Sequence, residues 1–465
     1  MPSPAGGIRR RMAAGDKSNM ARRRSKRKKL PEAPVTVSIE ALSHDGRGVA
    51  HVDGKVLFVD AALPGEIVQF VYTDSRRDYA EGRVVEVLTP APERVTPECP
   101  HFGNCGGCSF QHAGSEAQIL LKQQMLEEQF ARIGKLSIPE LWQPLTGPHW
   151  GYRHKARMGV KYVAKKGRVL VGFRERRNPF LADIEACPVM HPSVGTKLMD
   201  LSEMFGKLTI RDKIPQIEVA IGDAQCVLAI RVLDLPTEQD REIMSAFARQ
   251  HDITLYLQPK GPDSIVPLYP VNPELPTYAL PDQDIVFHFR PAMFTQVNTD
   301  INRKMVNRVL ETLALEKTDR VLDLFCGLGN FTLPMARHAG LVVGVEASKP
   351  LIEHARENAR LNGIDNVEFH AADLTRDIAD MTWARGSYDK ILLDPSRAGA
   401  AEVLPLLRQW QPRQVVYVSC NPATLARDAG MLVHELGYRL VKAGVMDMFP
   451  QTAHVESIAC FEQAR

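Results

Sequence analysis

The chain of 465 residues has no long apolar run, and no stretch of it approaches the roughly 18 uninterrupted apolar residues that a membrane-spanning helix requires. This absence excludes a helical membrane protein, and we expect a soluble protein with no membrane partner. The contents of 44% hydrophobic and 24% charged residues are those of ordinary globular domains. Because the chain exceeds the size at which a single core is usual, we expect two or three domains.

Acidic residues are almost missing from the first thirty positions, which hold 11 Lys and Arg side chains against one acid, Asp16. The whole chain has a formal net charge of only +3, so the remainder is net acidic. No apolar segment follows the basic run, which excludes a secretory signal peptide. We expect residues 1–30 to be a disordered tail, which either attracts phosphate backbones or only solubilises the protein.

The features of a disulfide-stabilised secreted protein are also missing. Eight cysteines without a secretory signal favour a reduced, cytoplasmic location and metal-binding or catalytic thiols. Cys99, Cys105 and Cys108 lie together in a glycine-rich segment. Cys187 is the best fourth ligand, because Cys226 lies in an apolar strand pattern. Four thiolates suit either zinc or an iron–sulfur cluster. Three histidines could serve as further zinc ligands: His101, His112 and His191.

The remaining chain divides by pattern into three segments. Residues 31–95 alternate short Val, Ile and Phe runs with Gly, Asp and Pro turns, which predicts an OB-like β-barrel. Such barrels often bind oligonucleotides, although a spacer role stays open. Residues 96–288 combine a helix, expected to be N-capped by Ser115 and to end at Gly134, with extended segments. This mixture predicts a central α+β domain with an antiparallel sheet.

Residues 289–465 alternate apolar strands with helical segments, as a doubly wound parallel sheet requires. Two last strand candidates, residues 438–449 and 454–463, are separated by only a short turn. They predict an antiparallel hairpin at the sheet edge, which methyltransferase sheets have and dinucleotide dehydrogenases lack. We therefore expect a C-terminal Rossmann-like class I methyltransferase domain.

The first strand of this domain leads into a loop where Gly327 and Gly329 let the backbone turn tightly against a ligand. Glu346 ends the next strand, where a carboxylate can accept both ribose hydroxyls. Asp373 follows the third strand, within reach of an adenine amino group. With Asp323 and Asn330 these residues indicate an S-adenosylmethionine site. A nicotinamide site is the alternative, and the missing third glycine weighs against it.

Two further strands end in polar groups that open onto the same crevice, Asp394 in DPSR and Cys420 in SCNP. Buried cysteines are usually inert core residues. Cys420 differs because it stands at a strand end beside Ser and Asn, just before a helix N-terminus that is expected to lower the pKa of its thiol. Cys326 and Cys460 look structural by comparison.

Five motifs occur in order along the C-terminal third: FTQVN (294–298), LDLFCGLGNF, LLDPSR, SCNPATLARD and HVESIA. This combination closely resembles the RNA uracil carbon-5 methyltransferases. Residues 45–50, DGRGVA, with Pro64-Gly65-Glu66, likewise resemble the TRAM module of RNA-modifying enzymes. One departure, Arg290-Pro291 where the family commonly has Ser-Pro, leaves the Phe294 and Gln296 positions in place.

The resemblance implies a mechanism with residue roles. Cys420 is expected to add to carbon 6 of uracil, which makes carbon 5 nucleophilic toward the methyl group of S-adenosylmethionine. Glu456 is expected to remove the carbon-5 proton, although by itself it would be interpreted as a solvated charge on an edge strand. The residues expected to line the cofactor and uracil pocket are Gln296, Phe325, Asn330, Glu346, Asp373 and Asp394.

The cysteine spacing resembles the [4Fe–4S] site of the ribosomal branch of the family. The resemblance therefore implies a structural or RNA-folding cluster on Cys99, Cys105, Cys108 and Cys187. Barrel, cluster and methyltransferase domain together imply 23S ribosomal RNA as the substrate, and we expect a monomer. The alternatives are methylation of a different uridine or of a transfer RNA. A non-catalytic role as an RNA-binding assembly factor is the other alternative. Because the body is net acidic, RNA is expected on local patches at Arg153, Lys155, Arg157 and Lys161 and at Arg174, Arg176 and Arg177.

Overall fold

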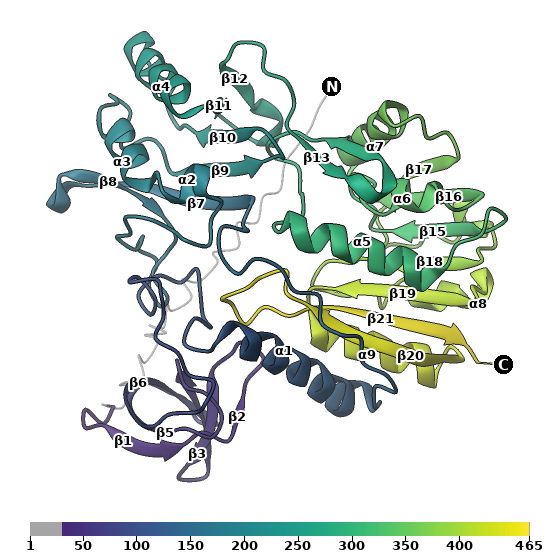
Figure 1. Ribbon diagram of the computed structural model, residues 1–465, viewed down its shortest axis with the longest axis horizontal. Coiled ribbons are helices and arrows are strands. Elements are labelled where there is room, and N and C mark those ends of the chain that lie inside the picture. Colours follow the sequence, from purple (N-terminus) through teal and green to yellow (C-terminus); the bar gives the residue numbers. More distant parts are fainter. Residues whose placement is uncertain (1–29, 465) are drawn as a thin grey trace, which may run out of the picture.

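A computed structural model describes residues 30–464 of the chain, so all of the predicted basic tail but its last residue lies outside the described residues. Three large sheets follow one another along the chain (Figure 1). Within residues 30–464, no helix is both long and apolar enough to span a membrane.

The N-terminal segment folds into a six-stranded, mostly antiparallel sheet, as the barrel prediction required. Its strands are β1 (Val35–Ser38), β2 (Ala41–Leu42), β3 (Gly48–Val52), β4 (Lys55–Asp60), β5 (Ile67–Ser75) and β6 (Tyr79–Thr89). They pair in the order β1-β5-β6-β4-β3-β2 around a small core that includes Val59 and Phe70. Gly82 of β6 allows Phe70 of β5 to pack against the backbone, because a Cβ atom there would lie 2.4 Å from the Phe70 ring.

The cysteine-rich segment leads into helix α1 (Ser115–Gln129), which a short π-helical turn extends through Phe130–Gly134. The predicted span is confirmed, but the predicted cap is wrong. Gly114 occupies the N-cap position and no side chain caps the helix. Buried residues of α1 belong to the same core as the C-terminal sheet, so this helix packs on the C-terminal sheet although it precedes the central one in sequence.

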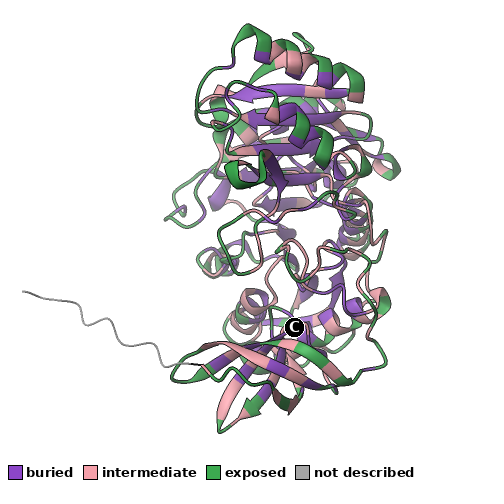
Figure 2. Cartoon of the chain, turned by 90° about the vertical axis from the view of Figure 1, so that its left-hand side faces the viewer, coloured by how far each residue is buried: buried purple, intermediate pink, exposed green. Residues whose placement is uncertain are grey.

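The central segment forms a second six-stranded sheet, in the order β12-β11-β10-β9-β7-β8. Its strands are β7 (Lys155–Val163), β8 (Arg168–Gly172), β9 (Gln216–Ile221), β10 (Cys226–Arg231), β11 (Ile253–Gln258) and β12 (Val266–Tyr269), with helices α2 (Pro192–Gly195), α3 (Leu198–Gly206) and α4 (Glu238–His251). One pair, β10–β11, is parallel rather than antiparallel, because α4 crosses over between these strands. Figure 2 shows long buried stretches along these strands, whereas the barrel strands alternate between buried and exposed residues.

The C-terminal sheet has seven strands in the order β17-β16-β15-β18-β19-β21-β20. They are β15 (Arg320–Leu324), β16 (Leu341–Glu346), β17 (Val367–Ala371), β18 (Lys390–Leu393), β19 (Gln414–Ser419), β20 (Tyr438–Met446) and β21 (Glu456–Gln463). Only β21 runs against the others, so the predicted doubly wound sheet with a terminal hairpin is confirmed.

Helices cover both faces of this sheet (Figure 1). They are α5 (Thr299–Leu313), α6 (Thr332–Ala336), α7 (Lys349–Leu361), α8 (Leu407–Trp410) and α9 (Pro422–His434), and a hairpin of β13 (Thr277–Leu280) and β14 (Ile285–His288) precedes them. Successive residues of β15 point to opposite faces: Val321 enters one core and Leu322 the other. Single helical turns lie at Ala164–Lys166, Pro262–Ser264, Pro281–Gln283, Trp383–Arg385 and Leu404–Leu406.

Candidate active site and cysteine site

A pocket of about 560 Å³ opens at the carboxyl ends of the parallel strands of the C-terminal sheet. Seven residues that the sequence singled out for catalysis and cofactor binding line it: Gln296, Phe325, Asn330, Glu346, Asp394, Cys420 and Glu456. The order of the sheet explains their meeting, because β16, β15, β18 and β19 are consecutive neighbours and end on the same side.

The loop after β15 turns through left-handed backbone conformations. Phe325, Gly327 and Gly329 have φ angles of 68°, 55° and 88°. Such angles are easy for glycine and unusual for phenylalanine, so the Phe325 conformation is imposed by its surroundings. Its backbone amide donates to the carbonyl of Val345 on β16. The loop therefore presents backbone at close range to any molecule in the pocket.

Asn330 is fixed at the end of this loop by two side chains. It exchanges two amide hydrogen bonds with Asn302 on α5, at 2.9 and 3.0 Å, and its carbonyl oxygen also accepts from the Tyr278 hydroxyl at 3.0 Å. Below the loop, burial raises the pKa of Asp323 to about 8, and this carboxylate accepts a hydrogen bond from Thr332.

Two predicted cofactor carboxylates behave differently. Glu346 ends β16 inside the pocket and accepts a hydrogen bond from the Ser348 amide at 3.0 Å. Asp373 does not line the pocket. It is exposed two residues beyond β17 and is held by Thr375 and Arg376, with a 3.0 Å contact to the Arg376 guanidinium.

Cys420 and Glu456 stand on neighbouring strand ends. Ser419, the last residue of β19, pairs with Ser457 of β21, which places the residues beside them at the same edge of the pocket. The interpretation of Glu456 as a solvated edge charge is wrong, because β21 lies between β19 and β20 and the side chain is buried. Burial raises the pKa of Glu456 to about 8, and Arg397 lowers it.

The expected depression of the Cys420 pKa is also wrong for the free protein. Burial, followed by the charges of Glu456 and Asp394, raises the pKa of Cys420 to about 11. Arg397 opposes this rise. Burial raises the pKa of Asp394 well above its usual range as well, and Glu456 adds to the effect. The part of the pocket around Cys420, Asp394 and Glu456 is thus desolvated and disfavours negative charge.

Sequence reasoning missed several residues that line this pocket. Arg397 lies in the LLDPSR motif, and His454 is the first residue of HVESIA, so both motifs contained the signal. Burial and, to a smaller extent, the charge of Arg397 lower the pKa of His454 to about 4, so its ring is neutral near pH 7. The ring nitrogen of His454 lies 3.8 Å from the Glu456 carboxylate. Phe449 packs against His454 with ring centroids 4.2 Å apart.

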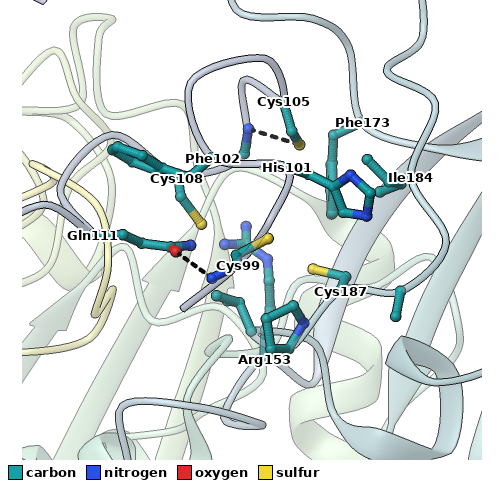
Figure 3. A pocket seen from close by; sticks show the side chains of 14 residues that line it. Cys99, His101, Phe102, Cys105, Cys108, Gln111, Arg153, Phe173, Ile184 and Cys187 are labelled. Carbon is teal, nitrogen blue, oxygen red and sulfur yellow. Dashed lines mark hydrogen bonds between the residues drawn. The ribbon is translucent and has the colours of Figure 1, made fainter. Parts of the chain in front are cut away.

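The four predicted cluster cysteines line a second cavity of about 130 Å³. Cys99, Cys105 and Cys108 come from one segment, and Cys187 comes from the loop before α2 (Figure 3). Figure 3 shows all four cysteine side chains around this cavity, with Cys105 on the loop drawn above the other three. Burial, together with a smaller contribution from the neighbouring thiols, raises the pKa of Cys108 to about 12.

The surroundings of this cavity distinguish the candidate ligands. Of the three spare histidines only His101 lines the cavity, while His191 interacts with Ser193 at the start of α2. Among the described residues, no three His, Cys, Asp or Glu side chains are grouped closely enough to hold a single metal ion. All eight cysteines, which the described residues include, are free thiols.

The predicted basic patches are only partly surface features. Lys155 is 9% exposed and lies 3.6 Å from Glu218, so it is a buried ion pair and not part of an RNA-binding patch. Arg177 contacts Asp60 of the barrel at 2.5 Å, and Arg176 lies 3.7 Å from the same carboxylate. These two arginines join the central segment to the barrel. Arg157, Lys161 and Arg174 remain exposed.

The sheet order with a single reversed strand, the glycine loop after its first strand and the carboxylate at the end of the second define a class I S-adenosylmethionine-dependent methyltransferase. A solved structure shares this fold over 92% of this chain and 99% of its own, with a TM-score of 0.69 and 23% identity. It is the tRNA (uracil-54, C5)-methyltransferase of Pyrococcus abyssi in complex with S-adenosyl-L-homocysteine.

Comparison with known sequences narrows the class further. The family model of tRNA (Uracil-5-)-methyltransferases matches residues 274–464, and that of the TRAM domain matches residues 33–85. The predicted TRAM-type barrel is thereby confirmed. Two relatives are named 23S rRNA (uracil(1939)-C(5))-methyltransferase RlmD. The protein of Methylococcus capsulatus is 53% identical over 95% of this chain and 99% of its own, and that of Alkalilimnicola ehrlichii is 54% identical over 94% and 98%.

The chain belongs to the RNA uracil-C5-methyltransferase family, as its motifs indicated.

Proposed function

We propose that this protein transfers a methyl group from S-adenosylmethionine to carbon 5 of a uridine in 23S ribosomal RNA. The names of the two relatives given above specify uracil 1939, and identity above 50% over nearly the whole chain favours the same nucleotide here. The observation that carries the chemistry is the meeting of Cys420, Glu456 and the cofactor loop around one pocket.

The bound cofactor supplies an electrophilic methyl group, and the residues of this chain prepare the nucleophile. Carbon 5 of uracil is a weak nucleophile until the Cys420 sulfur adds to carbon 6. Cys420 must therefore lose its proton as RNA binds, and Arg397 is the cation that favours its thiolate. Uracil must also leave its base stack to reach this pocket, which requires a flipped or unpaired nucleotide.

After methyl transfer Glu456 removes the carbon-5 proton, and the electrons left behind expel the Cys420 sulfur from carbon 6. A pKa of about 8 suits this task, because a general base works best when its pKa lies near the working pH. His454 is neutral and lies beside Glu456, where it can hold the carboxylate in place. Gln296, Phe325, Asn330 and Glu346 are the residues proposed to hold the cofactor, and Asp394 the uracil ring.

Asp373 keeps its proposed cofactor role only if the exposed loop after β17 closes over the adenine. Its carboxylate is engaged by Thr375 and Arg376, and these contacts compete with an adenine amino group. Titration with the cofactor separates the two cases, since Asp373→Ala weakens binding only if the loop closes.

We further propose that Cys99, Cys105, Cys108 and Cys187 hold a [4Fe–4S] cluster. Four thiols around one cavity fit that group, and apolar Phe173 and Ile184 on the wall limit water access. Arg153 also lines the cavity, where its charge can offset the thiolates. The cluster's task is structural, because the methyl transfer needs no electron.

The remaining proposals concern partners and organisation. The barrel contacts the RNA outside the pocket, the protein acts as a cytoplasmic monomer, and its central unit spans residues 96–288.

The proposed function is tested by incubating the purified protein with 23S RNA and labelled cofactor. Digestion of the RNA and mass spectrometry should give 5-methyluridine at one position. Tight RNA binding without a methylated product would instead identify a non-catalytic assembly factor, and a product formed only on transfer RNA would change the substrate.

A further inference from the structure

The loop between β20 and β21, residues 447–455, joins the catalytic pocket to the N-terminal half of the chain. Two of its side chains, Phe449 and His454, line the pocket, and Glu456 follows it directly. In Figure 1 this yellow loop leaves the C-terminal sheet and extends toward the segments that precede the central sheet. Glu456 is the first residue of β21, so this loop adjoins the catalytic carboxylate.

Gln451 is the residue through which the loop meets the cysteine-rich segment. Its backbone carbonyl accepts hydrogen bonds from the amides of Ser109 and Phe110, at 3.1 and 3.0 Å. The Ser109 hydroxyl in turn accepts from the amide of Ala453 at 2.9 Å. Ser109 directly follows Cys108, so a proposed cluster ligand and the catalytic loop are joined by adjacent residues.

Helix α1 holds the other side of the same residue. The Gln118 side chain accepts from the Gln451 amide at 2.8 Å and donates to the Gln451 side-chain oxygen at 3.0 Å. Both glutamines are buried, with exposed fractions of 1% for Gln118 and 2% for Gln451. The backbone amide, the backbone carbonyl and the side-chain oxygen of Gln451 thus all form hydrogen bonds with residues more than 300 positions away in sequence.

The backbone at Gln451 is in a left-handed conformation, with a φ angle of 67°. A residue with a side chain rarely adopts this angle unless its surroundings impose it. Here the contacts from two separate elements provide that constraint. The barrel adds a third close approach, since a Cβ atom on Gly46 would lie 2.5 Å from that of Ala453.

We propose that Gln451 is a positioning residue through which the cysteine segment and helix α1 hold Glu456 in the catalytic pocket. The inference rests on the proposed methyltransfer and adds a role for the N-terminal half of the chain. RNA binding and the cysteine site then affect the reaction through the placement of the base, in addition to any direct contact with the substrate.

The test uses the full-length protein with its cysteine site loaded, and compares Gln451→Ala with the milder Ser109→Ala. Gln414→Ala is the matched control. Gln414 also donates a partly buried hydrogen bond, to the carbonyl of Thr312, but it lies at the end of β19 away from the pocket. Three quantities are measured: the turnover rate on 23S RNA, the dissociation constant of S-adenosylhomocysteine, and the amount of covalent protein–RNA complex that survives denaturing electrophoresis.

A displaced base slows proton removal but not the addition of Cys420, so covalent complex should accumulate. We expect kcat of Gln451→Ala to fall by about tenfold or more, because misplacement by an ångström can cost up to about a hundredfold. KM and cofactor affinity should change less than about twofold. Ser109→Ala should show the same pattern more weakly, and Gln414→Ala should match the wild type.

Unchanged turnover and unchanged covalent complex in both variants would overturn the inference. A loss of turnover with an equal loss of cofactor affinity and no trapped complex would also overturn it, since that pattern reports general unfolding. If Gln451→Ala does not fold, Ser109→Ala alone decides. A wild-type protein without methylation activity would refute the proposed function instead, and it is recognised before any variant is measured.

Discussion

Lys122 of helix α1 and Asp447 of the β20–β21 loop form an ion pair with 2.7 Å between the ammonium nitrogen and a carboxylate oxygen. Both side chains are almost fully buried, with exposed fractions of 0% and 1%. Lys122 also donates to the carbonyl of Phe449 at 3.0 Å. Burial lowers the pKa of Lys122, and Asp447 counters that effect. This ion pair is therefore a second contact, besides that of Gln451, that holds the β20–β21 loop against helix α1.

Breaking this pair should be costly. Lys122→Met leaves the Asp447 carboxylate buried without its partner, and we expect a loss of about 3–5 kcal/mol in the free energy of unfolding. The double variant Lys122→Met with Asp447→Leu should recover most of that loss, because it removes both buried charges. Thermal unfolding of the wild type, the single variant and the double variant measures the loss and the recovery of stability. A single variant as stable as the wild type would show that the pair does not form.

The raised pKa of Glu456 predicts a pH-dependent stability in the absence of RNA and cofactor. The folded pKa is about 8 and the ordinary value is 4.5, so this group favours folding below about pH 4.5 and loses that contribution as the pH rises through 8. Glu456→Gln should therefore raise the melting temperature relative to wild type more at pH 8.5 than at pH 5.5. Glu462→Gln, on the same strand but partly exposed, is the control and should show no such difference. Equal effects at both pH values would contradict the buried state of Glu456.

Arg397 should act on the rate through charge. It lowers the pKa of both Cys420 and Glu456, so its removal raises both values. For Arg397→Gln we expect the rise of kcat/KM with pH to shift to higher pH, with a loss on the order of tenfold near pH 7 for each unit of pKa change. Arg397→Lys keeps the charge and should retain the wild-type midpoint. A uniform loss at all pH values in both variants would assign Arg397 to RNA binding only.

The cysteine site can be tested by its metal content. Protein purified without oxygen should contain about four iron and four sulfide per chain and be brown. Cys187→Ala should lose most of the iron, whereas Cys226→Ala, buried in β10 and away from the cavity, should keep it. A colourless wild-type protein with one zinc per chain would refute the cluster and restore the zinc alternative.

Much of the fold could be predicted from sequence because its signals are local. Apolar strands separated by helices produced the C-terminal sheet, and the closeness of its last two strands predicted the hairpin. The pocket could be predicted as well. The carboxyl ends of parallel strands lie at one edge of the sheet, so Glu346, Asp394 and Cys420 all lie there in any order of these strands. Glu456 needed the family resemblance, since sequence alone could not show that β21 lies inside the sheet.

The errors concern properties that depend on distant parts of the chain. The pKa of Cys420 is raised by burial and by the charges of Glu456 and Asp394, which lie far from it in sequence. Lys155 looked like a surface cation, but Glu218 of the neighbouring strand covers it. Gln451 carried no sequence signal, because its partners Ser109 and Gln118 lie far away along the chain.

The most direct test of the account is the analysis of 23S RNA after incubation with S-adenosylmethionine and either wild-type protein or Cys420→Ala. We predict that the wild type forms 5-methyluridine at one position and that a covalent protein–RNA complex is detected during turnover. Cys420→Ala should form neither, while still binding cofactor and RNA. Equal methylation by both proteins, or a methyl group on an atom other than carbon 5 of uracil, would contradict the account.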